Sequence, residues 1–379
     1  MSEYLANIND RFRDPSLAKQ LLERINQAVK TLGRPINLME VCGTHTVSIS
    51  RNGIRQILPE GLKLLSGPGC PVCVTAQRDI DVIIEVVKDP EVILTTYGDM
   101  IKVPGTVSNL QEAKAIGRAV KVVYSPLDAL KIATENPDKL VIFYSVGFET
   151  TAPMAAATLE LAAAQGVTNF KVYSVHKMVP PALAVLLDAD EVKIDGFILP
   201  GHVSSVVGGE AYRPVTEKYG VPAVIAGFEP LDILLGIERL VIQLVKGRAA
   251  VENAYSRAVN WEGNTVAKQI LAQFFQPVDA DWRGIGVIPG SGLELADEFD
   301  AFNARNTEAI AAASHRLVGF KSEIKGCRCG DVLKGIILPY ECPLFGKACT
   351  PSHAIGPCMV SSEGSCAAYY KYERHRQVV

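Results

Sequence analysis

Two hydrophobic patterns alternate along the chain up to residue 226. Short apolar runs rich in β-branched residues predict eight strands, at 36–41, 62–65, 92–96, 121–124, 140–146, 170–175, 196–199 and 223–226. Stretches in which apolar residues recur every three or four positions predict helices at 16–32, 76–88, 109–118, 151–165 and 180–187. Strands that are apolar throughout and separated by such helices are typical of parallel sheets with helices on both faces.

The predicted fold class is α/β, with two similar parallel-sheet lobes and a third domain. We expect the first lobe over residues 33–118 and the second over 119–230; one continuous sheet is the alternative. The third domain would combine residues 1–32 with 231–379 and be partly helical. Its helices are expected over 231–246, 261–275 and 294–316. Near the C-terminus Gly, Pro and Cys dominate, so a bound cluster rather than an apolar core would have to fold that segment.

The charge of the chain bears on its partners. The 379 residues carry 38 Lys and Arg against 41 Asp and Glu, a net charge of -3 without a long basic run. Binding to nucleic acids depends on clustered basic side chains, so we expect no nucleic-acid partner. No stretch approaches the roughly 20 apolar residues of a transmembrane helix, and the polar N-terminus lacks the apolar segment of a signal peptide. We therefore expect a cytoplasmic protein that does not engage membranes.

Six of the nine cysteines fall within 40 residues near the C-terminus. The spacing C-x14-C-x6-C-x16-C selects four of them: Cys327, Cys342, Cys349 and Cys366. Four thiolates on a loop-rich segment suit a [4Fe–4S] cluster or a structural zinc ion. The segment lacks the short C-x2–4-C knuckles of zinc sites, so the spacing favours the cluster. A set of inert buried thiols, to which Cys329 and Cys358 would also belong, is the remaining alternative.

Cys70 and Cys73 form a C-x-x-C pair in GPGCPVCVT, after a predicted strand and before the helix expected from residue 76. Unpaired N–H groups at a helix N-terminus stabilise a thiolate and lower the pKa of the leading cysteine, as reversible dithiol–disulfide chemistry requires. The alternative is half of a zinc site that cysteines of the C-terminal segment complete.

The remaining cysteine, Cys42, follows the first strand in MEVCGTHT, where Gly43 permits a tight turn before a helix capped by Thr46. A thiolate is a suitable ligand for ferrous iron, and His45 is close enough in sequence to ligate the same metal or to hydrogen-bond its other ligands. A buried cysteine beside a core histidine is the alternative.

Polar side chains also follow four other predicted strands: Asp99, Glu149, His176 and His202. Each alone is compatible with a helix cap or a core histidine. Because ligands bind beyond the carboxyl ends of the strands in open parallel sheets, we expect the four to share one cleft.

Several segments together make the chain resemble the HypD family of [NiFe]-hydrogenase maturation proteins: CGTHT, GPGCPVCVT, GFETT and CRCG…ECPLFGKAC…GPCMVSSEGSC. The resemblance runs over essentially the whole chain. It implies two similar α/β domains and a third domain that carries a [4Fe–4S] cluster beside a redox-active cysteine pair. It also implies a cytosolic protein that works with the small chaperone HypC to hold the iron on which the Fe(CN)2CO group is assembled. HypE, charged by HypF, would supply the cyanide.

The same resemblance implies roles for individual residues. Cys42 would be the essential ligand of the Fe(CN)2CO unit, shared with a cysteine of HypC, and His45 would lie beside it. Cys70 and Cys73 would be the redox-active pair, and Glu149 of GFETT a further site residue. The cluster ligands would be Cys327, Cys342, Cys349 and Cys366. Electrons would pass from the cluster through the cysteine pair to the iron.

Two other functions fit the same residues. The chain could be a stand-alone iron–sulfur-dependent thiol/disulfide oxidoreductase, for which Cys42 is incidental. It could also be a non-enzymatic interaction module with a structural zinc ion in its C-terminal segment. Loss of hydrogenase maturation on replacing Cys42 would separate the first alternative from the assembly scaffold, and analysis for iron and sulfide would separate the second.

Overall fold

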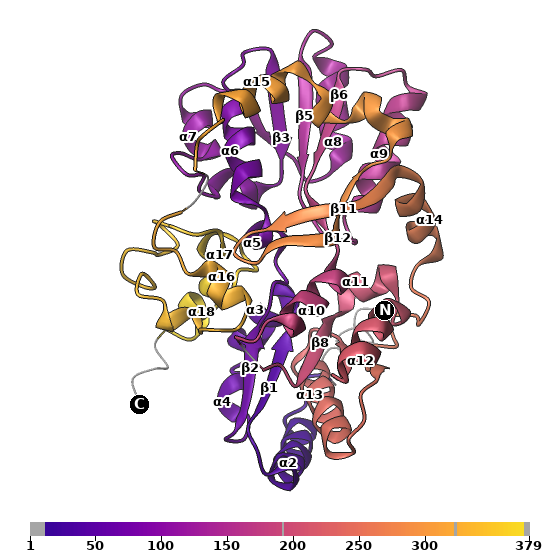
Figure 1. Cartoon of the computed structure of the whole chain (residues 1–379), viewed down its shortest axis with the longest axis vertical. Helices are drawn as coiled ribbons and strands as arrows, with labels where there is room; N and C mark the ends of the chain where they lie inside the picture. Colours follow the sequence, from indigo (N-terminus) through magenta and orange to yellow (C-terminus); the bar gives the residue numbers. More distant parts are fainter. Residues whose placement is uncertain (1–11, 192, 322–323, 375–379) are drawn as a thin grey trace.

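The computed structural model describes residues 12–191, 193–321 and 324–374, which form two stacked lobes with a third region beside their junction (Figure 1). The lower sheet has the order β10-β9-β8-β1-β2, with β1 (Ile36–Glu40), β2 (Leu62–Ser66), β8 (Gly196–Pro200), β9 (Ala223–Ala226) and β10 (Val251–Asn253). The upper sheet has the order β4-β3-β5-β6, with β3 (Val92–Thr96), β4 (Val120–Val122), β5 (Leu140–Ser145) and β6 (Phe170–Ser174). Every pairing in both sheets is parallel, so the α/β class and all eight predicted strands are confirmed.

The strands are divided between the lobes differently from the expectation. β3 lies in the upper sheet with β4, β5 and β6, whereas β8 and β9 return to the lower sheet beside β1. The chain thus enters the upper lobe after β2 and leaves it before β8. The expected lobes 33–118 and 119–230 are therefore wrong, because a crossover connection lets a parallel strand pair with a neighbour far away in the sequence.

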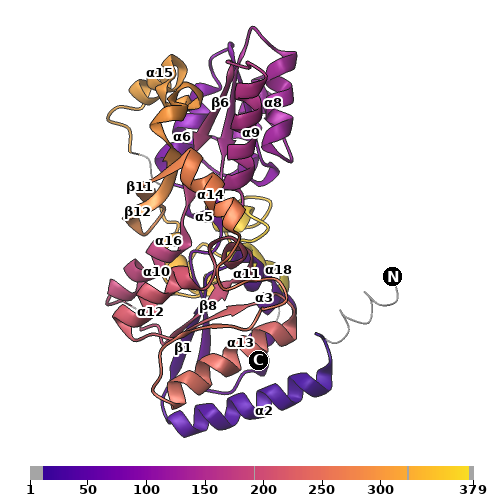
Figure 2. The same cartoon turned by 90° about the vertical axis from the view of Figure 1, so that its right-hand side faces the viewer.

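Helices cover both faces of the lower sheet. α2 (Pro15–Leu32) and α13 (Pro230–Val245) run side by side along one face (Figure 2), where Ile25 and Ile237 pack against Leu38. α10 (Val179–Asp188) and α12 (Arg213–Tyr219) cover the other face and pack against Phe197. α2 begins after Asp14, whose carboxylate accepts the Ser16 N–H, as helix capping requires.

The upper sheet is covered in the same way. α6 (Gln77–Val86) and α7 (Leu110–Ala115) lie on one face with α15 (Glu308–Arg316), which comes from much later in the chain. α8 (Pro126–Glu135) and α9 (Ala152–Ala164) lie on the other face. α14 (Thr265–Phe274) joins the second group, with Phe274 packed into the same apolar cluster. Each lobe therefore contains segments from distant parts of the chain.

A small antiparallel sheet lies at the junction of the lobes (Figure 1). It consists of β7 (His176–Lys177), β11 (Phe275–Trp282) and β12 (Gly286–Leu295), in the order β11-β12-β7. The expected helices over 261–275 and 294–316 are shorter in the structure, where α14 and α15 are the α-helical parts and Asp297–Phe302 and Ala304–Asn306 form short 3-10 helices. The hairpin escapes prediction because β11 alternates between buried and exposed positions and β12 contains Pro289 and three glycines, so neither forms an apolar run.

The C-terminal region, residues 324–374, forms short helices joined by turns and is called the tail below. It contains α16 (Cys329–Leu333), α17 (Pro357–Val360) and α18 (Ser365–Tyr372). α17 packs against α5 (Pro71–Val74) and α18 against α3 (Gly43–Arg51), so the tail lies on the cysteine-bearing loops of the lower lobe. The remaining short helices are α4 (Ile54–Ile57) and α11 (Gly201–Val207). Among the described helices, none has both the length and the apolar character that a membrane crossing demands.

Candidate functional site

A cleft of about 640 Å³ lies between the lobes, with walls from both lobes and from the tail. Residues just beyond the carboxyl ends of β1, β3, β5 and β8 line it, where open parallel sheets bind their ligands. Its polar lining includes Cys42, Thr44, Asp99, His202 and Glu363. The expectation of a shared cleft is therefore confirmed for Asp99 and His202, and Cys42 lines the same cleft.

Glu149 and His176 do not line this cleft, so the expectation of a shared cleft is wrong for them. Glu149 is 2% exposed; its Oε1 accepts the N–H of Val179 at 2.9 Å, at the start of α10. Its Oε2 is buried and has no hydrogen-bond partner in the described part of the chain, and burial raises its pKa to about 7. His176 is buried between the hydroxyls of Ser145 and Ser174. A role for Glu149 at the site stays a prediction.

Cys42 lies at the N-terminus of α3, immediately after β1. The helix starts at Gly43 with Cys42 as its N-cap residue, not at a cap made by Thr46 as expected. Thr46 lies inside the helix, where its hydroxyl donates to the buried carboxylate of Glu40. The other oxygen of Glu40 accepts the Cys42 N–H at 3.1 Å. Glu40 therefore fixes the backbone that carries the thiol.

The environment of the Cys42 thiol favours binding of a cation. Burial raises the pKa of this thiol to about 12, and the carboxylates of Glu363 and Glu40 raise it further in the same direction. The thiol therefore keeps its proton at neutral pH, and a metal ion would have to displace this proton in order to bind the thiolate. Nearby negative charge opposes an isolated thiolate but favours a bound metal cation.

His45 is buried behind Cys42 and does not line the cleft. Its Nε2–H donates to the carbonyl of Gly227 at 2.9 Å, while Nδ1 is buried without a hydrogen-bond partner in the described part of the chain. Its ring packs 4.9 Å from that of Phe228, which lies 4.1 Å from the ring of His202. Burial lowers the pKa of His45 to about 4, so the ring is neutral. Its predicted place beside the metal stays a prediction.

Glu363 is a cleft residue that the sequence analysis did not single out. It comes from the tail, and its Oε1 accepts the hydroxyl of Thr44 at 2.7 Å. A side chain at Gly43 would overlap Glu363, so the glycine lets the tail lie directly on the Cys42 turn. More than 300 residues separate the two segments, and local sequence patterns carry no signal for such a contact.

Cys70 and Cys73 form a disulfide, and both are at most 3% exposed. Cys70 is the N-cap residue of α5, and its Sγ accepts the Cys73 N–H at 3.2 Å. The helix that Cys70 caps is the four-residue α5, which contains Cys73, whereas the helix expected after the pair, α6, starts at Gln77. The expected position of the leading cysteine at a helix N-terminus is confirmed, although the helix is different.

The loops that carry Cys42 and the disulfide are in backbone contact. The Gly43 N–H donates to the carbonyl of Gly69 at 2.8 Å. A Cβ at Gly69 would overlap the backbone of Cys42, so only glycine permits this approach. The two sulfur-bearing motifs that are separate in the sequence therefore form one rigid unit at the edge of the cleft.

All six cysteines of the tail line one small cavity: Cys327, Cys329, Cys342, Cys349, Cys358 and Cys366. The other walls are mainly apolar and include Leu344, Phe345 and Met359. A Cβ at Gly356 would overlap the Sγ of Cys327, so this glycine makes room for the sulfur. Soft sulfur donors around an apolar cavity fit an iron–sulfur cluster in donor type.

The selection of four ligands among these six stays a prediction. The neighbouring Cys358 thiol and burial raise the pKa of the Cys329 thiol well above its usual value. Burial and the neighbouring thiols raise the pKa of Cys366 well above its usual value. Within residues 12–191, 193–321 and 324–374, no three His, Cys, Asp or Glu side chains are arranged to hold a single metal ion.

Arg283 is a second residue that the sequence analysis did not single out. It lies on the unpredicted hairpin, and its Nε donates to the carbonyl of Thr75, two residues after the disulfide, at 2.9 Å. Its Nη2 is buried without a hydrogen-bond partner in the described part of the chain. Burial lowers its pKa, which the nearby thiols of Cys329 and Cys358 counteract. A buried cation therefore lies between the disulfide loop and the cysteine cavity.

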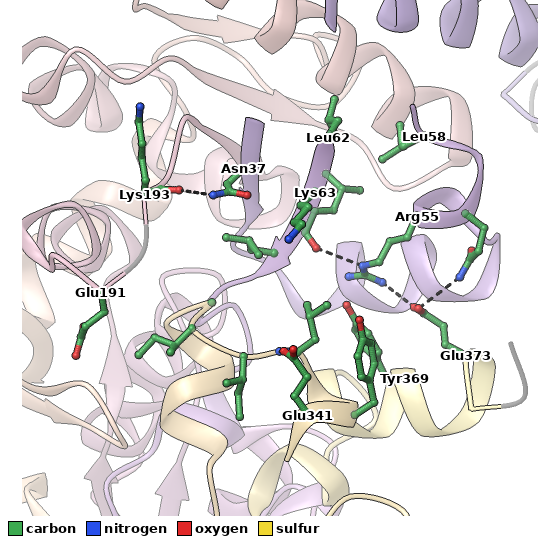
Figure 3. Close-up of a pocket in the computed structure, with 18 residues that line it drawn as sticks. Asn37, Arg55, Leu58, Leu62, Lys63, Glu191, Lys193, Glu341, Tyr369 and Glu373 are labelled. Atoms are coloured by element: carbon green, nitrogen blue, oxygen red, sulfur yellow. Dashed lines mark hydrogen bonds and ion pairs between the residues drawn. The ribbon is translucent and has the colours of Figure 1, made fainter. Parts of the chain in front are cut away.

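A second large cavity, of about 670 Å³, lies between the edge strand β2 and the tail (Figure 3). Its buried cation, Arg55, donates to Glu373 at 2.7 Å and to the hydroxyls of Ser50 and Ser66. No cysteine or histidine is among the described residues that line this cavity. Because its buried charges, Arg55 and Glu373, already pair with each other, we interpret the cavity as a contact that holds the tail rather than as a reactive site.

Comparisons with known proteins agree with this arrangement. The family profile described as HypD, "Hydrogenase formation hypA family", matches residues 16–373. The hydrogenase maturation factor HypD of Azotobacter vinelandii is 46% identical over 378 residues, which cover 98% of each chain. That of Escherichia coli is 44% identical over 370 residues, or 96% of this chain and 98% of the relative. A putative hydrogenase expression/formation protein of Methanocaldococcus jannaschii is 41% identical over 98% of this chain and 100% of the relative. The chain therefore belongs to the HypD family of hydrogenase maturation factors.

Proposed function

We propose that this maturation factor is the scaffold on which iron is held, as its substrate, while the Fe(CN)2CO group is assembled. The observation that carries the proposal is the position of the Cys42 thiol: it lines the inter-lobe cleft, and its turn is in backbone contact with the disulfide loop. The nearby carboxylate of Glu363 adds negative charge that favours a bound cation. His45 would orient ligands from behind the thiol.

The tail would hold a [4Fe–4S] cluster through Cys327, Cys342, Cys349 and Cys366. The donor type and apolar walls of their shared cavity support this assignment. When bound, the cluster would supply electrons one at a time, and reduction of a disulfide requires two of them. Cys70 and Cys73 would be the dithiol that takes up such electrons next to the cleft.

Partners follow from the chemistry of the assembly. A HypC-type small chaperone would share the iron with Cys42 and would approach through the open side of the cleft. HypE, charged by HypF, would donate cyanide to iron in the same place. All of these steps would take place in the cytoplasm, where thiols are kept reduced.

Infrared spectroscopy of the chain co-purified with its small partner under exclusion of oxygen tests the proposal. Metal-bound cyanide and carbonyl bands are expected in the wild-type complex and should vanish in Cys42→Ala. Ser205→Ala is the matched control, because Ser205 lines the same cleft without bearing sulfur and its hydroxyl donates to the His202 carbonyl. Bands that persist in Cys42→Ala would refute the assignment of Cys42.

The alternative is a stand-alone iron–sulfur-dependent thiol/disulfide oxidoreductase. The buried disulfide next to a cysteine-lined cavity supports this reading as well. Under it, Cys42→Ala should leave reduction of a protein disulfide unchanged while Cys73→Ala abolishes it. Under the scaffold proposal, both variants should abolish hydrogenase maturation.

A further inference from the structure

Residues 361–363 of the tail connect all parts of the site. They lie in the sequence between Cys358 and Cys366, two of the cysteines that line the tail cavity. Ser361 and Ser362 contact Asp99 of the upper lobe, and Glu363 accepts the hydroxyl of Thr44 in the lower lobe. The segment therefore spans the cleft beside the disulfide.

Ser361 is the member of this segment that reaches the disulfide. Its Oγ lies 3.4 Å from the Sγ of Cys70 and 3.4 Å from Oδ2 of Asp99, and it accepts the N–H of Glu363 at 3.2 Å. A sulfur in a disulfide carries no hydrogen, so the hydroxyl itself must be the donor in any bond to Cys70. One proton thus faces two acceptors.

Asp99 has other hydrogen-bond donors besides the Ser361 hydroxyl, whereas a reduced Cys70 would depend on this hydroxyl more strongly. Its Oδ2 also accepts the N–H of Ser362 at 3.1 Å and the hydroxyl of Ser362 at 3.0 Å. For the Cys70 sulfur, which is 3% exposed, the only other donor recorded among the described residues is the Cys73 N–H at 3.2 Å. A buried thiolate with a single donor is costly, and a hydrogen bond to a charged group is roughly twice as strong as one between neutral groups.

We propose that Ser361 is a positioning residue for the dithiol. When the disulfide is reduced, the Ser361 hydroxyl breaks its hydrogen bond to Asp99 and donates to the Cys70 thiolate that forms. This inference rests on the proposed function in that the pair must be reducible. With a dithiol reductant the balance is simple. The reductant loses two electrons and closes its own disulfide, the Cys70–Cys73 bond breaks, Cys73 takes one proton as a thiol, and the second proton is released to solvent.

The structure gives this bond a consequence in the cleft. When Ser361 turns toward the thiolate, Asp99 keeps only its contacts with Ser362, which is exposed. Reduction of the pair thereby changes the hydrogen bonds of the tail segment that also carries Glu363, which contacts Thr44 close to Cys42. Ser361 acts through Cys70 and does not touch the iron site.

The test is the reduction potential of the pair in the full-length protein, under exclusion of oxygen, in dithiothreitol redox buffers at one pH. Acid trapping, alkylation and mass spectrometry of the Cys70–Cys73 peptide report the reduced fraction of this pair alone. In Ser361→Ala we expect the equilibrium constant for reduction to fall about tenfold, a potential about 30 mV more negative. Ser361→Thr keeps the hydroxyl and should stay within about twofold of the wild type.

Ser362→Ala is the matched control, because it removes a neighbouring hydroxyl that contacts Asp99 but not Cys70. Its potential should stay within about twofold of the wild type. Equal potentials for Ser361→Ala and Ser362→Ala would overturn the inference while leaving the proposed redox role intact. A wild-type pair that no buffer reduces would overturn that role and this inference with it. If Ser361→Ala fails to fold, a tenfold loss in Ser361→Thr overturns the inference.

Discussion

The ion pair between Arg55 and Glu373 should stabilise the end of the tail, helix α18, against local unfolding. Arg55 Nη1 lies 2.7 Å from Glu373 Oε1, and the two side chains are only 12% and 7% exposed (Figure 3). The guanidinium also lies 4.5 Å from the ring centre of Tyr369 in α18. The perturbation that isolates the charge is Glu373→Gln, which keeps size and shape.

The expected loss follows from the geometry. Removing one partner of a fully buried pair costs about 3–5 kcal/mol, because the other charge is left uncompensated. Arg55 keeps the hydroxyls of Ser50 and Ser66 and the ring of Tyr369, so we expect about 2 kcal/mol. A local loss of this size corresponds to about 30-fold faster hydrogen exchange of the α18 amides, since each 1.4 kcal/mol is about tenfold.

Hydrogen exchange followed by mass spectrometry measures this local opening directly. Glu191→Gln is the matched control at the other end of the same cavity, where Glu191 is 52% exposed and pairs with Lys334. An exposed pair contributes about 0–1 kcal/mol, so exchange of α18 should stay within about threefold of the wild type. If Glu373→Gln also stays within threefold, the pair does not anchor α18 and the reasoning is wrong.

Three further perturbations test other parts of the structure. Burial lowers the pKa of His176 to about 3 against an ordinary 6.5, so the stability that the neutral ring contributes is present above pH 6.5 and is lost as the pH falls toward 3. Between pH 7 and 5, the free energy of unfolding measured by urea titration should fall by about 1–2 kcal/mol less in His176→Asn than in the wild type. Gly356→Ala would press on Cys327 and should lower bound iron by at least half, measured by metal analysis. Gly69→Ala would overlap the backbone of Cys42 and should cost about 1–3 kcal/mol of stability in thermal unfolding.

One substitution serves as the control for both glycine variants. A Cβ at Gly98 would lie 3.7 Å from Val122, an ordinary contact, so Gly98→Ala should keep wild-type iron content and stability. Wild-type iron in Gly356→Ala would show that this glycine does not serve the cysteine cavity. An unchanged melting temperature in Gly69→Ala would show that the two loops separate easily. For His176→Asn, the same pH dependence as the wild type would mean that the ring titrates normally.

The strands were predictable because most of their residues are apolar, as is typical of strands buried on both faces, although β2, β4 and β6 each contain one lysine (Lys63, Lys121 and Lys171). The assignment of strands to lobes was not predictable in the same way. β3 and β8 are equally apolar, yet one pairs with β5 and the other with β1. Which neighbour a parallel strand takes depends on the path of the connections between sheets, and local patterns do not carry that path.

In the site, too, residues within local sequence motifs were predictable, whereas residues placed by long-range contacts were not. The turn at Cys42 and the pair Cys70/Cys73 were visible because cysteine, glycine and proline stand together at the ends of strands. Glu363 and Ser361 were not visible, since serine and glutamate are common surface residues and their contacts with Asp99, Cys70 and Thr44 lie 262 residues or more away. Glu149 was misplaced because a polar residue after a buried strand can also turn inward and accept the N–H groups of a helix.

The position of the tail indicates why two α/β lobes are combined with a cysteine-rich segment. The tail connects the cysteine cavity with the cleft between the lobes. Residues 361–363 contact Asp99, Cys70 and Thr44, and they lie in the sequence between Cys358 and Cys366, which both line the cysteine cavity. Such a short segment has little apolar surface of its own, so the geometry of the cysteine cavity determines where Ser361 and Glu363 lie. A group that binds in this cavity would therefore stabilise the contacts at the cleft as well, because ligation and folding of a metal-binding segment are coupled.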